Sequence, residues 1–324
     1  MRAIQISSYG APSEVIGLVE IDEPPRPWRG QVLLGMDYAP ISMHDLYVAQ
    51  GLFPVRPQAP SVIGNEGVGR VLAVGPEVEG LRVGDRVLAP LFSMTWRERL
   101  VVDAAGLFPL PEEADPRQLS MLGINPPTAS LILSEYVDLQ PGDWVVQNAA
   151  NSGVGRSLIA IAKQRGLRTI NFVRRAELVD ELLAAGGDIV ALDRPDELAR
   201  IAQIVGSGRV RLGVDGVAGK ATTALTRVMT EQSVLLAYAV ASGEPMAVNM
   251  LDLVYKRMAA YGFYLGHPEH AEALAEAVAE AAPLVISGQL HVPIAATYPL
   301  EAIKEAVAHA QRGGKVLLEI TASA

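Results

Sequence analysis

Apolar and polar positions in the first third of the chain follow a β-type pattern. Short apolar runs, QVLLGM (31–36), GVGRVLAVG (67–75) and GDRVLAPLF (84–92), are separated by clusters rich in Pro and Gly such as DEPPRPWRGQ (22–31). Short apolar runs bounded by turn residues are typical of β-strands. This part of the sequence therefore predicts an irregular, barrel-like β domain.

The pattern changes around Pro116, where an apolar helical stretch runs from Gln118 to Tyr136 and is interrupted by Pro126 and Pro127. Beyond it, strand-like and helix-like runs alternate. The strand-like runs are 143–148, 168–175, 188–193, 210–217 and 233–240, and the helix-like runs between them are 154–166, 177–187, 195–206 and 220–230. Alternation with short connections predicts a parallel sheet covered by helices on both faces.

The last part of the chain changes pattern again near Tyr261. A long helix is predicted over 267–288, then an extended run over 291–300, a second helix over 301–314 and a final strand over 315–320. The simplest organisation is an α/β fold in which a doubly wound Rossmann domain, residues 120–260, is inserted in a β-rich domain made of 1–119 and 261–324.

Composition narrows the class of protein. The 324 residues carry a formal net charge of -9, which argues against nonspecific binding to nucleic acid, and there is no cysteine for disulfides or thiolate chemistry. No apolar run approaches the roughly 18–20 residues of a membrane span, and the first residues show no signal or transit pattern. We therefore expect a cytoplasmic enzyme or binding protein without a membrane partner.

One turn of the predicted Rossmann domain has the pattern of a dinucleotide-binding turn. QNAANSGVGRS (147–157) lies between a predicted strand and a predicted helix, where a Gly-x-Gly-x-x-Gly turn would cradle a dinucleotide. Ala150 and Ser152 replace the first two glycines, while Gly155 keeps the third. Both replacements are small, and the helix that follows would present its N-terminal amides to a phosphate.

The residues at the end of the next strand indicate which of the two nicotinamide dinucleotides is bound. An NAD site usually has an acidic residue there for the ribose hydroxyl, whereas this chain has Arg174 and Arg175. Guanidinium groups pair with a 2′-phosphate, which favours NADPH. The alternative is that both arginines only begin a solvated helix. Asn171 is also a candidate, although it lies within the strand.

These features together resemble the medium-chain dehydrogenase/reductase superfamily over essentially the whole chain. The segment 64–87, GNEGVGRVLAVGPEVEGLRVGDRV, resembles the one typical of the first, GroES-like domain of that superfamily. At positions where zinc-dependent members have a histidine and a cysteine ligand, this chain has Asn65 and Ser42. The resemblance therefore implies a zinc-free reductase with no metal site.

Within the superfamily the chain is most similar to mitochondrial-type 2-enoyl thioester reductases, and it also has features of quinone oxidoreductases. GNEG (64–67), INPPTA (124–129), QNAANSGVG (147–155), NFVRR (171–175) and GFYLG (262–266) carry the likeness. The resemblance implies a set of residues that line the cofactor site. They are Asn125, Thr128, Asn151, Ser152, Gly153, Val154, Asn171, Arg174, Arg175, Tyr238, Phe263, Leu265 and Lys315.

One position departs from that family. The family's proposed proton-donating tyrosine matches Phe53, whose phenyl ring cannot donate a proton or hydrogen-bond a thioester oxygen. Three other residues are candidates for the acid, because reduction of an activated alkene needs a proton as well as a hydride. Tyr47 and His44 precede Phe53, and Tyr264 replaces a Trp of the family segment. For each, the alternative is a role in packing or capping alone.

The sequence thus favours NADPH-dependent reduction of an α,β-unsaturated carbonyl compound, either an enoyl thioester or a small enal or enone. A quinone oxidoreductase is the alternative enzyme, because a quinone needs no positioned carbon acid. A non-catalytic NADPH-binding protein is the alternative of another class. The apolar segment 233–265 also predicts a homodimer, since the matching region of the superfamily pairs two subunits.

Overall fold

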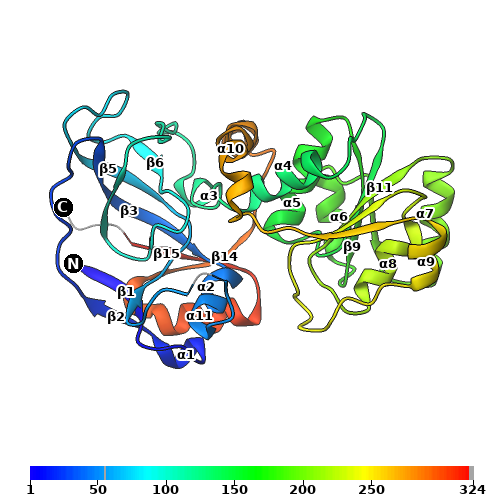
Figure 1. The fold of residues 1–324 in the computed structure, drawn as a ribbon, viewed down its shortest axis with the longest axis horizontal. Helices are drawn as coiled ribbons and strands as arrows, with labels where there is room; N and C mark the ends of the chain where they lie inside the picture. Colours follow the sequence, from blue (N-terminus) through cyan, green and yellow to red (C-terminus); the bar gives the residue numbers. More distant parts are fainter. Residues whose placement is uncertain (55, 321–324) are drawn as a thin grey trace. The chain divides into compact units, whose positions relative to one another are not determined.

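The computed structural model describes residues 1–54 and 56–320, which form two compact units (Figure 1). One, here called the inserted unit, spans Asn125–Leu290. The other, the split unit, consists of Met1–Ile124 and the chain from His291 onward. The predicted fold class, a Rossmann domain inserted in a β-rich domain, is confirmed.

The second boundary lies later than the sequence predicts. The chain returns to the split unit at His291, whereas the prediction placed the return at Tyr261, and the first boundary differs by only a few residues. The reason is helix α10 (Ala271–Ile286), which packs against α4 (Asn125–Glu135) and α5 (Gly153–Gln164). Its apolar face is thus buried within the inserted unit.

Six parallel strands form the sheet of the inserted unit among the described residues. They are β8 (Trp144–Gln147), β9 (Arg168–Val173), β10 (Ile189–Leu192), β11 (Val210–Asp215), β12 (Val234–Ala237) and β13 (Ala259–Gly262). Their order is β10-β9-β8-β11-β12-β13, which is the doubly wound order with its switch point between β8 and β11. Residues at the carboxyl ends of these strands therefore meet at one edge of the sheet.

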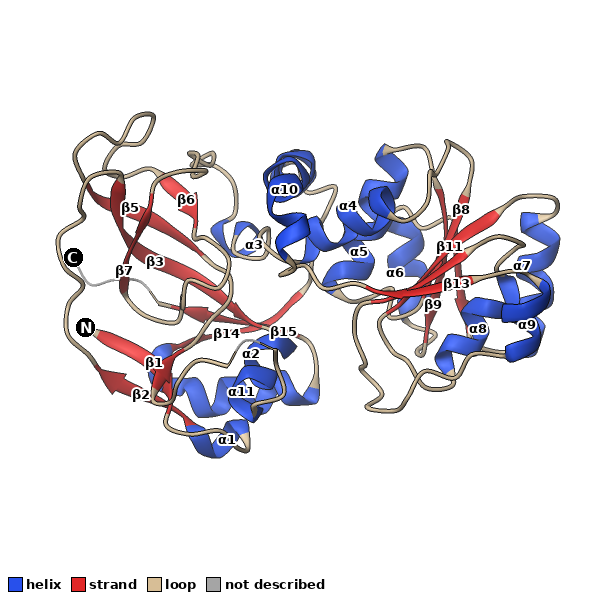
Figure 2. Cartoon of the chain, in the orientation of Figure 1, coloured by secondary structure: helices blue, strands red, loops and turns tan. Residues whose placement is uncertain are grey.

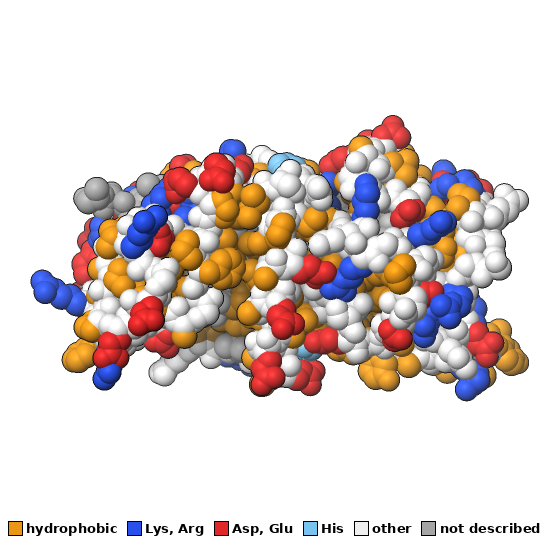
Figure 3. Space-filling view, turned by 90° about the horizontal axis from the view of Figure 1, so that it is seen from above, with side chains coloured by type: hydrophobic (Ala, Val, Ile, Leu, Met, Phe, Trp, Pro, Cys, Tyr) orange, Lys and Arg blue, Asp and Glu red, His pale blue; other side chains and the backbone are white. Residues whose placement is uncertain are grey.

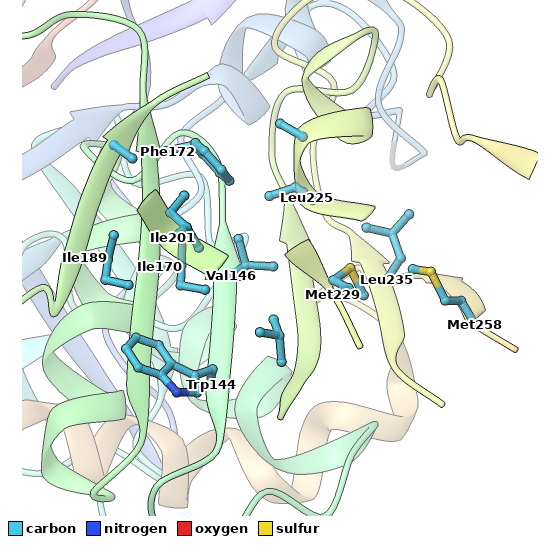
Figure 4. Packing of buried hydrophobic residues seen from close by; sticks show 13 residues of the cluster. Trp144, Val146, Ile170, Phe172, Ile189, Ile201, Leu225, Met229, Leu235 and Met258 are labelled. Atoms are coloured by element: carbon cyan, nitrogen blue, oxygen red, sulfur yellow. The ribbon is translucent and has the colours of Figure 1, made fainter. Parts of the chain in front are cut away.

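Helices cover both faces of this sheet (Figures 1 and 2). The remaining elements of the unit are α6 (Leu178–Ala184), α7 (Pro195–Val205), α8 (Ala221–Val228), α9 (Met250–Tyr255) and the 3-10 helix η1 (Pro268–His270). α5 and α6 lie on one face and α7, α8 and α9 on the other. In α7, Leu198, Ile201 and Val205 follow the helical repeat. Ile201 belongs to the buried cluster, beside Ile170 and Phe172 (Figure 4), and Leu198 and Val205 pack against that cluster.

The split unit is built mainly of antiparallel strands. Its strands are β1 (Arg2–Ile6), β2 (Ile16–Glu20), β3 (Gln31–Ile41), β4 (Ser61–Val62), β5 (Val68–Val74), β6 (Arg86–Leu88), β7 (Arg99–Asp103), β14 (Ile294–Pro299) and β15 (Lys315–Glu319). One sheet has the order β2-β1-β4, and the other β14-β15-β3-β5-β6 with β7 paired to β3. The last strand thus pairs with β3 near the start of the chain.

Short helices complete the split unit (Figure 2). They are α1 (Pro12–Val15), α2 (Met43–Gln50), α3 (Pro116–Leu119), α11 (Ile303–Arg312) and the 3-10 helix η2 (Leu300–Ala302). The prolines expected to interrupt a helix, Pro126 and Pro127, instead lie in the first turn of α4. Proline is tolerated there because a first-turn N–H has no intrahelical partner.

The molecular surface carries mixed charge. On the face seen in Figure 3, acidic and basic side chains are interspersed and no broad basic field appears. Within the described part of the chain, no helix is both long and apolar enough to cross a membrane.

Candidate active site

The turn after β8 has the geometry of a dinucleotide turn without its first two glycines. Ala149 adopts a left-handed φ of 49° at the bend, and the Ser152 hydroxyl accepts a hydrogen bond from the Gly155 N–H at 3.1 Å. A Cβ at Gly155 would lie 2.6 Å from the Ala150 carbonyl oxygen. Gly155 therefore performs the predicted task of letting α5 pack closely on the turn.

An unpaired donor lies beside the first turn of α5. A Cβ at Gly153 would lie 2.5 Å from Nδ2 of Asn125, so the two residues are in close contact. This buried Nδ2 has no hydrogen-bond partner within the described residues. Since the first-turn amides of α5 are also without intrahelical acceptors, several donors gather here. The arrangement fits the phosphates and polar groups of a dinucleotide.

The other predicted residues of these two helices differ in exposure. Asn151 is exposed, Ser152 and Gly153 are half-buried, and Val154 and Thr128 are buried. Val154 therefore packs its side chain inward, and its backbone N–H is the group that it can offer to an anion. Asn125 thus lies against the turn that contains residues 151–154.

Asn171 differs from the expectation that it lines the cofactor site. It is fully buried within β9, and its Oδ1 accepts a hydrogen bond from Gln147 Nε2 at 2.7 Å. Its Nδ2 donates to Thr169 Oγ1 at 2.9 Å and to the Ile189 carbonyl at 3.0 Å. With its amide used in this way, Asn171 fixes neighbouring strands beneath the turn.

Arg174 and Arg175 come directly after β9, at the predicted strand end. Both side chains are exposed, and Arg174 has no hydrogen-bond or ion-pair partner within the described residues. Arg175 Nε lies 3.6 Å from Oε1 of Glu177, a contact between two solvent-exposed groups. Exposed ion pairs of this kind contribute about 0–1 kcal/mol, so both guanidinium groups are available to an anion.

Tyr238 follows β12 and lies beside a buried polar network. Burial raises the pKa of the Tyr238 phenol to about 12; a hydrogen bond with Ser152 lowers that pKa and the Asp215 carboxyl raises it, both by less than burial does. The phenol is therefore protonated at neutral pH. Asp215 is fully buried and accepts from Asn148 Nδ2 at 2.7 Å and from the Ala218 N–H at 2.8 Å.

The segment after β13 places its aromatic rings in different surroundings. Phe263 is buried and stacks on His270 with a centroid separation of 4.8 Å, so its ring anchors the segment within the unit. Tyr264 and Leu265 are half-buried. The Tyr264 ring meets His267 edge-on at 5.3 Å, and burial raises the pKa of its phenol.

Helix α2 of the split unit carries two of the predicted acids. His44 is half-buried, its ring meets Phe53 edge-on at 5.8 Å, and its Nδ1 has no partner among the described residues. Burial and, to a smaller extent, the Lys315 charge together lower the pKa of His44 to about 4. The imidazole is thus neutral at pH 7. Tyr47 is half-buried.

Two buried carboxyl groups near Lys315 were not among the predicted site residues. Burial raises the pKa of Asp45 to about 7 and that of Glu66 to about 8, although the Lys315 charge lowers both. Asp45 Oδ2 accepts from the Ser42 N–H at 2.8 Å, and Glu66 Oε2 accepts from the Ile124 N–H at 3.0 Å. Ser42 and Asp45 form a capping box at the start of α2. Local sequence patterns do not reveal the burial of either carboxyl group.

No cluster of three or more His, Asp or Glu side chains suited to a metal ion occurs in the described part of the chain. The position of the histidine ligand in zinc-dependent relatives holds Asn65, which is buried. An amide is a weak ligand for zinc, which prefers Cys, His and carboxylate groups. The residues present thus do not form a zinc site.

A Rossmann unit with a phosphate-binding turn, joined to a GroES-like β domain, defines the chain as a nucleotide-binding dehydrogenase or reductase. Residues 29–112 match the family model of the alcohol dehydrogenase GroES-like domain, and residues 186–318 match that of the zinc-binding dehydrogenases. The mitochondrial enoyl-[acyl-carrier-protein] reductase of Rattus norvegicus is 33% identical over 316 residues, covering 95% of this chain and 84% of that protein.

Solved structures agree on the fold. The complex of Etr1p with NADP and crotonyl-CoA superimposes with a TM-score of 0.89 at 23% identity, over 98% of this chain and 99% of that one. Quinone oxidoreductase from Escherichia coli, complexed with NADPH, has a TM-score of 0.84 at 26% identity, and the match covers 99% of this chain and 100% of that chain. The chain belongs to the medium-chain dehydrogenase/reductase superfamily, in the family of the mitochondrial enoyl-[acyl-carrier-protein] reductases.

Proposed function

We propose that this chain is an NADPH-dependent reductase of α,β-unsaturated acyl thioesters, with enals and enones as related acceptors. The observation that carries the proposal is the exposed arginine pair directly after β9, beside a phosphate-binding turn. The rat relative, named as an enoyl reductase, and the Etr1p structure with NADP and crotonyl-CoA support it. The absence of zinc-ligating side chains at positions 42 and 65 agrees with it.

The residues of the inserted unit would hold the cofactor, which supplies a hydride from C4 of its nicotinamide when bound. The N-terminal amides of α5 and the Ser152 hydroxyl would bind the pyrophosphate. Arg174 and Arg175 would pair with the 2′-phosphate. Asn125 Nδ2, the unpaired donor beside Gly153, would bind a polar atom of the dinucleotide. Tyr238, Phe263, Leu265 and Thr128 would complete the walls, and the resemblance adds Lys315 to this set.

Among the three predicted acids we favour Tyr47. Its hydroxyl has no hydrogen-bond partner within the described residues, whereas His44 is neutral at pH 7 because its pKa is about 4. A phenol can deliver its proton to the α-carbon as enolate charge develops, and water can reprotonate it. Tyr264, whose ring packs on His267, would serve as a wall of the acceptor site.

The test is loss of NADPH absorbance at 340 nm with crotonyl-CoA, a longer enoyl-CoA, an enone and a benzoquinone. We expect turnover with the enoyl thioesters and a clear preference for NADPH over NADH. Absence of turnover with every alkene would reject the proposal. Tight NADPH binding without reduction of any acceptor would instead favour a non-catalytic binding protein.

A quinone oxidoreductase is the second candidate. Phe53 favours it, because a quinone needs no acid placed at a carbon atom, and so does the likeness to the Escherichia coli enzyme. Faster turnover of benzoquinone than of crotonyl-CoA at matched concentrations would establish this alternative.

We also propose that the chain forms a homodimer through the inserted unit. β13 lies at the edge of its sheet. The neighbouring α9 has four apolar residues whose exposed fractions lie between 59% and 77%: Met250, Leu251, Val254 and Tyr255. An exposed strand edge beside such apolar side chains is typical of an interface. Sedimentation should give twice the chain mass, and Leu251→Asp with Tyr255→Asp should give monomers.

For location we propose the cytoplasm, as the sequence predicts, whereas the rat relative is named as mitochondrial. Imaging the tagged chain in its own cells distinguishes the two compartments.

A further inference from the structure

The split unit contains a small apolar pocket beside helix α2. It has a volume of about 50 Å³, and its walls include Val48, Phe53, Ile63, Phe92 and Met94. One polar side chain, Asn65, also lines it. Engineered apolar cavities of about 150 Å³ bind benzene, so this pocket suits only a few carbon atoms.

Asn65 brings an unsatisfied donor to this pocket. Its side chain is 7% exposed, and its Nδ2 has no hydrogen-bond partner within the described residues. An unsatisfied buried polar group costs about 1–3 kcal/mol, and most buried polar groups in proteins are paired. A buried amide without an acceptor at an otherwise apolar pocket therefore points to a ligand that carries an oxygen acceptor.

The backbone around Asn65 is fixed on both sides. The Asn65 carbonyl accepts from the Phe92 N–H at 2.8 Å, and the Gly64 carbonyl accepts from the Thr95 N–H at 3.1 Å. Gly64 has a φ of 110°, and a Cβ there would lie 2.4 Å from the Trp96 ring. Because the Asn65 backbone is held before any ligand arrives, the amide is a preorganised donor.

We propose that Asn65 Nδ2 donates a hydrogen bond to the carbonyl oxygen of the acyl thioester, whose apolar carbons occupy the pocket. The proposal rests on the function proposed above. Phe53, at the family's tyrosine position, lines the same pocket as Asn65. Asn65 thus takes over the task of polarising the carbonyl.

As the β-carbon gains a hydride from NADPH, the π pair of the alkene moves toward the carbonyl oxygen and gives an enolate. Asn65 stabilises the negative oxygen and keeps its own proton. The α-carbon takes a proton from the Tyr47 hydroxyl, the C=O bond re-forms, and water reprotonates the phenolate.

The main test variant is Asn65→Asp, which keeps the side-chain shape and replaces the NH2 donor with an acceptor. With crotonyl-CoA we expect kcat to fall about 10²–10³-fold, as for loss of one oxyanion donor. The NADPH dissociation constant should stay within twofold. Gln311→Glu, the same amide-to-carboxyl change on the exposed face of α11, is the matched control and should keep full activity.

A rescue experiment separates this role from a structural one. Asn65→Ala should lose activity to a similar extent, and adding Phe53→Tyr, which restores the family hydroxyl, should recover at least tenfold. Infrared difference spectra of butyryl-CoA, ¹³C-labelled at the carbonyl, give a readout without turnover. The C=O stretch should lie at lower frequency in the wild-type complex than in the Asn65→Asp complex.

Three results would overturn the inference. The first is an active wild type whose Asn65 variants stay within threefold of it, and the second is an unchanged carbonyl frequency. The third is failure of both Asn65→Asp and Asn65→Ala to melt cooperatively, which would make the residue structural. If the wild type reduces no enoyl thioester at all, the proposed function itself fails, and the inference fails with it.

Discussion

Two sets of buried polar groups, one in each unit, differ in how their hydrogen bonds are satisfied. In the inserted unit, Gln147, Asn171, Asn148 and Asp215 form hydrogen bonds with one another or with the backbone beneath the phosphate turn. In the split unit, Asn65 Nδ2, Asp45 Oδ1, Glu66 Oε1 and His44 Nδ1 are buried without a partner in the described residues. The first set is complete as it stands, and the second is not.

This difference suggests that the first set has a structural role and the second set a role in the reaction. A satisfied network stabilises one arrangement of strands, so its side chains have little left to offer a ligand. Unsatisfied buried groups lower stability and persist where they serve a reaction. The comparison therefore predicts that substitutions in the first set chiefly affect folding, while those in the second chiefly affect turnover.

The largest effect on stability is expected from Asp215→Ala. Its carboxyl accepts from Asn148, Thr222 and two backbone N–H groups, and each buried donor left unsatisfied costs about 1–3 kcal/mol. We expect the free energy of unfolding to fall by at least about 3 kcal/mol in urea titrations. The exposed Asp22→Ala is the control and should change it by less than about 0.5 kcal/mol. A similarly small change for Asp215→Ala would remove the structural role assigned to this network.

The next effect concerns the exposed cations of the inserted unit. Arg174→Asp combined with Arg175→Ser should raise the NADPH dissociation constant well over tenfold, because charge-assisted hydrogen bonds are worth about 1.5–3 kcal/mol each. NADH affinity should change far less, and fluorescence titration measures both. Arg194→Ser, a matched change on an exposed arginine after β10, should leave both constants unaltered. An unchanged preference for NADPH in the double variant would contradict the assignment.

The smallest effect is a pH dependence of stability from Glu66. Its pKa is raised to about 8 by burial, so between pH 6.5 and 8 the folded state binds more protons than the unfolded state. Stability should therefore fall as pH rises through this window, by up to about 1.4 kcal/mol per pH unit. The pKa of His44 is lowered to about 4, so its contribution to stability rises with pH below pH 6.5 and does not offset the fall caused by Glu66 above that value.

Glu66→Gln, which resembles the protonated acid, should flatten that fall. Asp45, whose pKa is raised to about 7, would leave a residual slope of the same sign. Unfolding in urea at closely spaced pH values from 6.5 to 8 measures the slope. Equal slopes for wild type and variant would show that Glu66 is ionised in the folded state.

Most elements of the fold followed from the pattern of apolar residues. The strand and helix runs from Asp143 to Val240 coincide with β8 to β12 and their helices, because buried parallel strands and amphipathic helices have distinct periods. The boundary near Leu290 was missed. The sequence of helix α10 shows that one of its faces is apolar, but it does not show which unit that face packs against.

The candidate site was only partly accessible to such reasoning. The turn at 147–157 and the arginines after β9 could be proposed from the sequence because a phosphate site depends on local backbone and charge. Asn171 was misjudged, because side-chain direction within a strand depends on its neighbours. The burial of Glu66, Asp45 and the Asn65 amide depends on distant segments such as Ile124 and Phe92, which no local pattern reveals.

The most direct test of the account follows the hydride. A single turnover of crotonyl-CoA with NADPH deuterated at the transferred C4 position should give butyryl-CoA with one deuterium on the β-carbon, as read by mass spectrometry and NMR. The Arg174→Asp, Arg175→Ser variant should give the same label at a lower rate. Butyryl-CoA without deuterium, or no butyryl-CoA at all, would contradict the claim that this chain reduces enoyl thioesters with NADPH.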